Sequence, residues 1–212
     1  MSVTGELPVT LPGPAGPIEA RFHPGSGDGR VAVVCHPHPL HGGSMDNKVV
    51  TTLCRAWRDE GLAVVRFNFR GVGGSAGIHA DGVGEVDDLL AVLRWLVEGQ
   101  GARHLLLGGF SFGAWVAAAA AGRLPDGLVL DHLVLIAPPV RYAGFDALQP
   151  PAATVVVQGS ADDVVDPASV VAWVASRQAP PVMVWLEGAG HFFHGRLASL
   201  KAELAARLFP GQ

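Results

Sequence analysis

The stretch Leu105–Ala120, which reads LLLGGFSFGAWVAAAA, decides the fold of this chain. An apolar run ends at a pair of glycines, and the alanine-rich segment that starts after Ser111 favours a helix. Gly109 and Gly113 stand two positions before and after the serine, in the pattern G-x-S-x-G. A serine on so sharp a strand-to-helix turn has a strained backbone, and glycines avoid collisions across it. The pattern predicts a nucleophile elbow that lifts the Ser111 hydroxyl clear of a sheet.

The rest of the chain alternates between β-branched apolar runs and segments with helical periodicity. The predicted strands are 30–35, 62–68, 104–109, 130–136, 153–159 and 181–187, and the predicted helices are 46–61, 85–99, 112–124, 166–178 and 196–209. Before them, 6–11 and 17–22 favour a leading antiparallel pair. This order predicts a doubly wound α/β fold with a mostly parallel sheet and helices on both faces. The loop 138–151 is too short for a substantial lid.

Composition narrows the function classes. The chain has 212 residues, 49% of them hydrophobic and 16% charged, with a net charge of -4. We expect one domain over residues 1–212, no nucleic-acid or membrane partner, a cytoplasmic location, and a monomer or homodimer. Cys35 and Cys54 lie in apolar surroundings and are expected to be reduced core residues.

A nucleophilic serine needs a histidine base, and two candidates follow the last predicted strand. His191 comes after the sequence Gly-Ala-Gly, which frees its loop to fold back toward the carboxyl edge of the sheet. His194 stands at the entry to the terminal helix, where a solvated side chain is expected. We therefore favour His191 as the base.

The acid that orients the base is expected between the serine and the histidine in this fold class. Asp162, Asp163 and Asp166 follow the strand 153–159. Asp166 precedes Pro167 at the start of a helical pattern, so it is explained as a helix N-cap. Asp162 and Asp163 remain candidates for the acid.

Acyl transfer also needs N–H donors for the oxyanion. One is the N–H of Phe112, directly after the nucleophile, and the other is expected in the loop HPHPLHGGS, residues 36–44. Prolines carry no N–H, so His38, Leu40 and His41 are the donors available there, and His38 is the best placed. The two X-Pro steps stiffen this loop.

Together, HPHPLHGGSMDNKVV, VVRFNFRGVGGSAG, GFSFG, GSADDVVDP and GAGHFFHG resemble the α/β-hydrolase superfamily, in particular its small lidless bacterial serine hydrolases. The resemblance spans nearly the whole chain. It implies a triad of Ser111, His191 and Asp162, without a catalytic role for Asp163. It also implies oxyanion donors at His38 and Phe112, and a dispensable His41.

We therefore expect a carboxylesterase-like serine hydrolase that cleaves a small carboxylic ester or thioester through an acyl-enzyme, with no cofactor and no metal. A peptidase or amidase of the same fold is the alternative. The side chains of Phe110, Leu40, Phe192 and Tyr142 are candidates for the substrate pocket, although an aromatic residue in such a position is as often core.

Three other interpretations compete with this one. His36, His38 and His41 are spaced almost as in a metallo-β-lactamase-type metal site, but Leu40 stands where an aspartate ligand is expected. The glycines of 71–76 formally match a dinucleotide-binding turn, yet no helix starts in that turn. A binding protein without turnover on the same fold is the third. The pairing of Arg70 with acids near the start of the helix 85–99 is expected to be structural.

Overall fold

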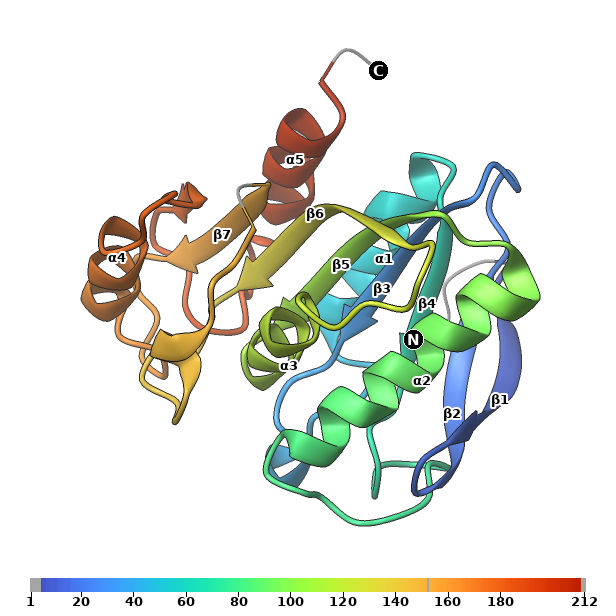
Figure 1. The fold of residues 1–212 in the computed structure, drawn as a ribbon. Helices are drawn as coiled ribbons and strands as arrows, with labels where there is room; N and C mark the ends of the chain where they lie inside the picture. The colour runs from blue at the N-terminus through green and yellow to red at the C-terminus, as the bar shows by residue number, and fades with distance from the viewer. Residues whose placement is uncertain (1–4, 152, 211–212) are drawn as a thin grey trace.

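A single twisted sheet organises the molecule (Figure 1). The computed structural model describes residues 5–151 and 153–210. The strands there are β1 (Leu7–Gly13), β2 (Gly16–His23), β3 (Arg30–Cys35), β4 (Ala63–Phe67), β5 (His104–Phe110), β6 (Val129–Ile136), β7 (Thr154–Gly159) and β8 (Val182–Leu186). Their spatial order is β1-β2-β4-β3-β5-β6-β7-β8. β1 pairs antiparallel with β2, and β2 with β4, whereas all later pairs are parallel. The leading antiparallel pair and the mostly parallel sheet are confirmed.

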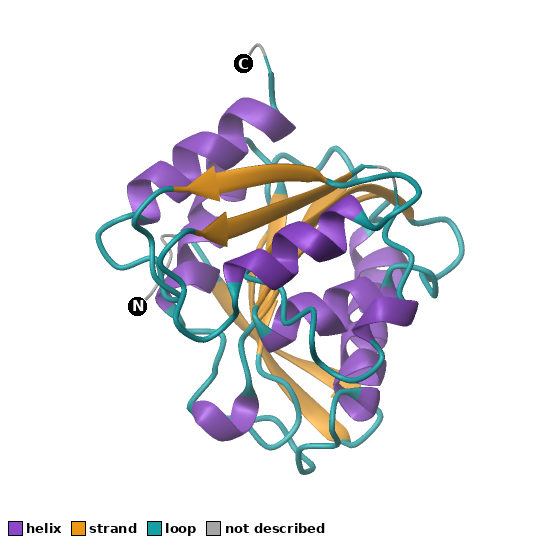
Figure 2. Cartoon of the chain, turned by 90° about the vertical axis from the view of Figure 1, so that its left-hand side faces the viewer, coloured by secondary structure: helices purple, strands orange, loops and turns teal. Residues whose placement is uncertain are grey.

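Helices cover both faces of the sheet (Figure 2). They are α1 (Lys48–Asp59), α2 (Val83–Gln100), α3 (Phe112–Ala120), α4 (Pro167–Ala175) and α5 (Leu197–Leu208), with short 3-10 turns η1 (Pro39–His41) and η2 (Phe145–Ala147). α2, α3 and α4 bury their apolar sides in one cluster, and α1 and α5 in a second cluster across the sheet. Because both faces are covered, the central strands are apolar on both sides. The predicted doubly wound architecture is confirmed.

Local signals fix several element ends. Asp166 caps α4 by accepting the Ala168 N–H, as the sequence predicted, and Asn47 caps α1 by accepting the Val49 N–H. The loop 138–151 holds only the short turn η2 and builds no lid. Cys35 and Cys54 are buried free thiols whose pKa burial raises. Among the described residues, no helix combines the length and the apolar character that a membrane crossing requires.

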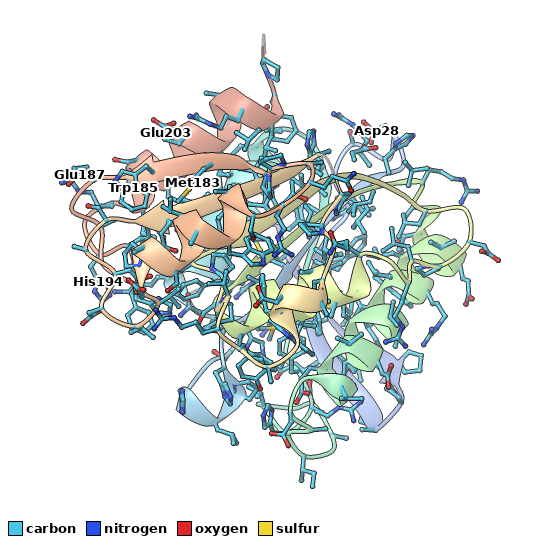
Figure 3. The ribbon with its side chains drawn as sticks, turned by 60° about the vertical axis from the view of Figure 1, so that its left-hand side comes forward. Asp28, Met183, Trp185, Glu187, His194 and Glu203 are labelled. Carbon is cyan, nitrogen blue, oxygen red and sulfur yellow. The ribbon has the colours of Figure 1, made fainter. Side chains whose placement is uncertain are left out.

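The sheet ends at β8 on one side. Val184 and Leu186 point into the core, whereas Trp185 is half exposed on the outer side (Figure 3). The indole Nε1 of Trp185 donates to Glu187 Oε2 at 3.1 Å. Val184 and Leu186 thus complete the second apolar cluster, whereas on the other face Met183 packs against the first cluster and Trp185 is partly exposed.

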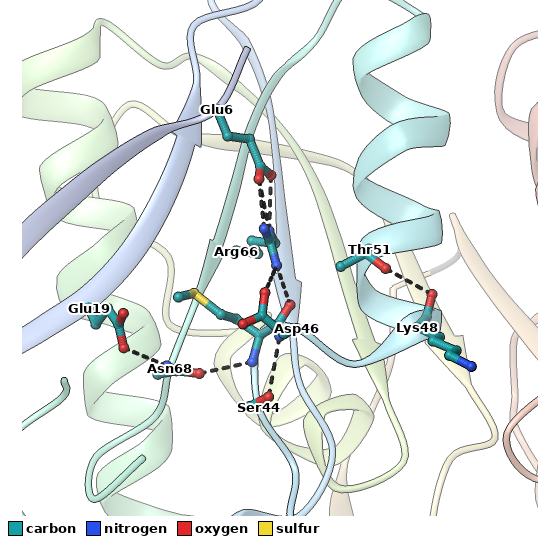
Figure 4. A network of polar contacts seen from close by, with 9 residues as sticks. Glu6, Glu19, Ser44, Asp46, Lys48, Thr51, Arg66 and Asn68 are labelled. Carbon is teal, nitrogen blue, oxygen red and sulfur yellow. Dashed lines mark hydrogen bonds and ion pairs between the residues drawn. The ribbon is translucent and has the colours of Figure 1, made fainter. Parts of the chain in front are cut away.

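A buried ionic network ties the first strand to the loop 36–47 (Figure 4). Arg66, on β4, is almost fully buried and donates from Nη2 to Glu6 Oε2 at 2.7 Å. The same guanidinium donates to the Met45 carbonyl at 2.9 Å and pairs with Asp46. Burial opposes the charge, but the hydrogen bonds that Arg66 donates to Glu6 and Asp46 outweigh it and raise the pKa of Arg66. The network therefore anchors the end of the loop to the sheet.

A polar chain beside Arg66 holds the same loop. Asn68 Oδ1 accepts the Met45 N–H at 2.9 Å, and Asn68 Nδ2 donates to Glu19 Oε2 at 2.8 Å. Glu19 lies on β2, so the loop after β3 depends on the leading antiparallel pair for its placement. This arrangement gives that pair a structural role next to the loop that carries His38.

Removing one partner of the buried pair should destabilise the protein. We expect Glu6→Ala to lower the free energy of unfolding by roughly 3–5 kcal/mol, because it leaves the buried Arg66 charge partly uncompensated. The exposed pair Lys201–Asp59 provides the control, and Lys201→Ala should cost less than about 1 kcal/mol. Urea unfolding measures the free energy of unfolding of both variants. Equal losses in the two variants would contradict a stabilising role of the buried Glu6–Arg66 pair.

Candidate active site

Ser111 sits on a strained turn between β5 and α3. Its backbone has φ 54° and ψ −119°, which a non-glycine residue rarely adopts. A Cβ at Gly109 would lie 2.1 Å from the Gly113 carbonyl oxygen, and one at Gly113 would lie 2.3 Å from the Cys35 carbonyl oxygen. The first glycine thus avoids a clash across the turn, as predicted. The second one allows the start of α3 to touch the end of β3.

The structure brings Ser111, His191 and Asp162 together at the carboxyl ends of β5, β8 and β7. His191 Nε2 lies 3.2 Å from Ser111 Oγ, within hydrogen-bond reach. His191 Nδ1 lies 2.9 Å from Asp162 Oδ2. The imidazole therefore bridges the hydroxyl and the carboxylate, and both His191 and Asp162 are nearly excluded from solvent.

Two loops must touch for this contact to form. A Cβ at Gly159, the last residue of β7, would lie 2.2 Å from the Ala189 carbonyl oxygen. That carbonyl accepts the Ala161 N–H at 3.0 Å. Gly159 therefore lets the loop of the base pack directly on the loop of the acid. The left-handed backbone of Phe193, with φ 52°, turns the chain back toward α5 after His191.

Asp162 is held as an ionised acceptor. Its Oδ1 accepts the Val164 and Val165 N–H groups at 2.9 and 2.8 Å. Burial opposes ionisation, but the hydrogen bonds from His191, Val165 and Val164 outweigh it and lower the pKa of Asp162. Asp163, its neighbour, points to the surface and is exposed.

The other candidates of the two loops lie elsewhere. Asp166 accepts the Ala168 N–H and pairs with Arg141 at 2.9 Å, outside the contact of serine and histidine. His194 is exposed and stacks on Phe192 with ring centroids 5.9 Å apart, at the surface near β8 (Figure 3). Of the residues weighed as acid and base, the pair beside Ser111 Oγ is therefore Asp162 and His191.

The ring of His36 is structural. Its Nδ1 lies 2.6 Å from the Pro37 carbonyl oxygen, and its Nε2 accepts the Phe69 N–H at 3.0 Å. Burial lowers the pKa of His36 to about 4, and the hydrogen bond to Pro37 opposes this only in part. A neutral ring therefore joins the ends of β3 and β4. Both of its nitrogens already have protein partners, so metal chelation would cost these hydrogen bonds.

His38 and His41 join a ring cluster over Phe112. The His38 ring lies 4.6 Å from His41, 4.9 Å from His79 and 4.9 Å from Phe112, between centroids. Burial, followed by the nearby His41 and His79, lowers the pKa of His38. His79 Nδ1 lies 2.8 Å from Oε1 of the buried Glu85. The cluster packs the loop 36–44 against the residue that follows the nucleophile.

The predicted oxyanion donors are available as N–H groups. Among the described residues, neither the His38 nor the Phe112 N–H meets a hydrogen-bond acceptor. Phe112 opens α3, whose N-terminal N–H groups favour negative charge. Gly113 touches the end of β3, and the rings of His38 and Phe112 pack together, so the two residues lie close to each other beside the elbow.

Of the four predicted pocket residues, Phe110 is buried, whereas Leu40, Phe192 and Tyr142 are at least partly exposed. Phe110 has no exposed surface and packs under His191 with centroids 5.0 Å apart, so it is a core residue that supports the base. Leu40 is 70% exposed and Phe192 is 46% exposed. Tyr142 is half-buried and packs edge-on against Phe112 at 6.0 Å.

A cleft of about 270 Å³ opens beside the acid loop. Its walls are Pro139, Val140, Arg141, Tyr142, Val164, Val165, Asp166 and Ser169. Val165 also holds Asp162 through its N–H, and Tyr142 also packs on Phe112. Two residues of the cleft wall thus contact the site, Val165 at Asp162 and Tyr142 at Phe112. Its lining is largely apolar, with the Arg141–Asp166 ion pair across it.

The glycine loop 71–76 supports the sheet and does not begin a helix. Its Ala76 N–H donates to the Pro17 carbonyl of β2 at 2.8 Å, and the next helix starts only at Val83. Arg70 donates from Nη2 to Asp88 Oδ1 at 2.8 Å. The structural interpretation of the glycines and of this ion pair is confirmed.

Sequence reasoning missed two polar features of the site. His79 lies in a loop whose glycine-rich pattern gave no sign of the contact with Glu85. Gln158 donates from Nε2 to Asp162 Oδ2 at 3.0 Å. Its signal was visible, because it is the one polar side chain in the apolar run Val155–Gln158, directly before the acid loop.

A family model and a known protein each match more than half of this chain. The model of the family described as serine aminopeptidase, S33, matches residues 32–153. An uncharacterized protein of Rickettsia prowazekii is 40% identical over 192 residues, which cover 85% of this chain and 79% of that protein.

Two solved structures of α/β serine hydrolases are also similar to this chain over nearly its whole length. A lidless α/β serine hydrolase of Xanthomonas campestris is 42% identical with a TM-score of 0.89, over 98% of this chain and 95% of that one. An α/β serine hydrolase homologue of Coxiella burnetii is 43% identical with a TM-score of 0.89, over 98% of this chain and 100% of that one. The chain therefore belongs to the α/β-hydrolase superfamily, in a family of serine hydrolases, as its elbow sequence indicated.

Proposed function

We propose that this protein is a serine hydrolase that cleaves a small carboxylic ester or thioester through an acyl-enzyme. The observation that carries the proposal is the continuous contact from Ser111 Oγ through the His191 ring to Asp162, at 3.2 and 2.9 Å. A serine hydroxyl is a weak nucleophile, and a base held by a carboxylate activates it. This contact provides both groups next to Ser111.

Each residue has a defined task in the reaction. Ser111 Oγ attacks the substrate carbonyl carbon while His191 Nε2 takes the hydroxyl proton. His191 then gives that proton to the leaving alkoxide or thiolate, which leaves an ester on Ser111. Water, deprotonated by the same ring, hydrolyses this ester in the second half of the cycle. Asp162 keeps the proton on Nδ1 and stabilises the imidazolium.

The developing oxyanion is received by the N–H groups of His38 and Phe112. They have no acceptor within the described part of the chain, and the ring packing around them limits their motion. Donors fixed before the reaction stabilise the tetrahedral intermediate without reorganisation. In this mechanism the backbone N–H of His38 stabilises the oxyanion, and the His38 ring holds the loop in place by packing on Phe112.

The cleft supports an ester over a peptide substrate. The family description names an aminopeptidase, and an aminopeptidase must bind the ammonium group of its substrate. The carboxylate of Asp166 in the cleft is paired with Arg141, and the other lining is largely apolar. We therefore propose that the cleft takes an apolar part of a neutral ester. Faster turnover of an amino-acid arylamide than of nitrophenyl esters would favour the peptidase instead.

The nucleophile can be tested by covalent labelling. A fluorophosphonate should add one mass increment at Ser111, and Ser111→Ala should lose the label together with at least about 10,000-fold of kcat. Ser169→Ala changes a serine in the cleft wall away from His191 and should keep the label. Folded protein that takes up no label, or takes it up at another serine, would contradict the proposed function.

The oxyanion donor can be separated from its side chain. The φ of His38 is −52°, which proline also adopts, so His38→Pro removes the N–H at little cost to the backbone. We expect this variant to lose about 100- to 1000-fold in kcat, whereas His38→Ala keeps its N–H and should stay within about tenfold of wild type. Thermal melting checks that both variants fold. Similar losses in the two variants would refute a backbone role.

The cleft can be tested with esters of graded chain length. Val164 lines it and is exposed, so Val164→Trp should fill it with little effect on the core. We expect kcat/KM to fall about tenfold for octanoyl esters and to stay within about twofold for acetyl esters. Val171→Trp, on an exposed position of α4 outside the lining, is the matched control. A loss in Val164→Trp that is independent of chain length would place the substrate elsewhere.

A further inference from the structure

Gln158 is a buried amide in direct contact with the acid. It stands second from the end of β7, and its side chain is fully buried. Its Nε2 donates to Asp162 Oδ2 at 3.0 Å. The same oxygen lies 2.9 Å from His191 Nδ1. One carboxylate oxygen therefore receives the base on one side and the amide on the other.

The surroundings fix the orientation of the amide. Nε2 faces three acceptors, which are Asp162 Oδ2, the Gly159 carbonyl at 3.3 Å and, at the limit of hydrogen-bond distance, the Val165 carbonyl at 3.5 Å. A flipped amide would turn Oε1 toward all of these oxygens, including an ionised carboxylate. The donor side of Gln158 is thus the side that faces the acid.

The other end of the amide is unsatisfied. Gln158 Oε1 is buried and has no hydrogen-bond donor among the described residues. A buried acceptor without a partner destabilises the folded state, and an apolar side chain of similar shape would avoid this cost. The residue is therefore poorly explained by stability alone. Local conflicts of this kind gather at functional sites.

We propose that Gln158 is a positioning residue for the acid and base of the reaction. The proposal rests on the proposed function, since it assigns Gln158 a task within that site. Val164 and Val165 hold Oδ1 of Asp162, and Gln158 holds Oδ2, so the carboxylate cannot rotate away from His191. The amide also draws off part of the negative charge that the imidazolium meets.

The proposal predicts the direction of a pH effect. The base must be neutral to accept the Ser111 proton, so kcat/KM falls at the acidic end of its pH profile. Without the Gln158 N–H, the Asp162 carboxylate presents more negative charge to the imidazolium and stabilises it, so the acidic limb of kcat/KM moves to higher pH. The groups around the pair do not compete with this effect, because Phe110 and Phe192 pack on the imidazole and Asp163 is exposed.

The test uses Gln158→Met, which keeps the length of the side chain and removes both polar atoms. We expect kcat to fall about tenfold and the acidic limb of kcat/KM to move to higher pH by about half a unit or more. The melting temperature should stay equal or rise, because the unpaired Oε1 is gone. The downfield proton resonance of His191 Nδ1–H should also shift.

Thr154→Val is the matched control. Thr154 is a buried polar residue at the opposite end of β7, and its hydroxyl donates to the Pro151 carbonyl at 2.6 Å. Its substitution should lower the melting temperature and leave the pH profile unchanged. An acidic limb in Gln158→Met that is unchanged or moves to lower pH would overturn the positioning role.

The two proposals fail differently. If wild-type protein reacts with the fluorophosphonate at Ser111 and Gln158→Met reacts at the same rate over the whole pH range, the role of Gln158 is wrong and the proposed function stands. If the wild type takes up no label, the proposed function itself is wrong.

Discussion

The site depends on one backbone contact, the approach of Gly113 to the last carbonyls of β3. A Cβ at this position would lie 2.3 Å from the Cys35 carbonyl oxygen and 2.5 Å from that of His36. Without that approach, α3 could not start against the end of β3, and Phe112 would not reach the His38 ring. The absence of a side chain at Gly113 thus lets Ser111 and Phe112 lie next to the loop 36–44.

Asp162 and His191, the proposed acid and base, are brought together by a second contact of the same kind. Gly159 lets the Ala189 carbonyl approach the end of β7, and this brings the loops after β7 and β8 into contact. Both contacts lie at the carboxyl edge of the parallel sheet, where loops from neighbouring strands converge. The fold therefore brings these loops together at one edge of the sheet. Glycines near the strand ends then let the loops approach closely enough for their side chains to meet.

Much of this was predictable because the signals were local. The elbow motif, the Asp166–Pro167 cap and the alternation of apolar runs with helical periodicity each depend on a few neighbouring residues. The mostly parallel sheet with both faces covered then follows from general rules for alternating strands and helices, whereas the order of the strands was not predicted.

The features that escaped prediction depend on contacts between distant segments. Phe110 was weighed as a pocket residue, but the loop of His191 covers it and makes it core. The approach of His79 to Glu85 and to the His38 ring is set by the packing of a glycine-rich loop that has no periodic pattern. Arg66 reads as an interruption of an apolar strand, and its partners Glu6 and Asp46 lie 60 and 20 residues away. Composition and spacing carry no record of such pairs.

The ring of His36 makes a contact beside the site that tolerates mild acid. It connects the ends of β3 and β4 only while neutral, since a protonated Nε2 cannot accept the Phe69 N–H. Its pKa of about 4 keeps it neutral well below the range in which an ordinary histidine titrates. The imidazole at the start of a histidine-rich loop thus stays neutral and keeps its hydrogen bonds across the neutral range. The contact between the ends of β3 and β4 is therefore insensitive to mild acidification, although it is made by the side chain most associated with pH sensing.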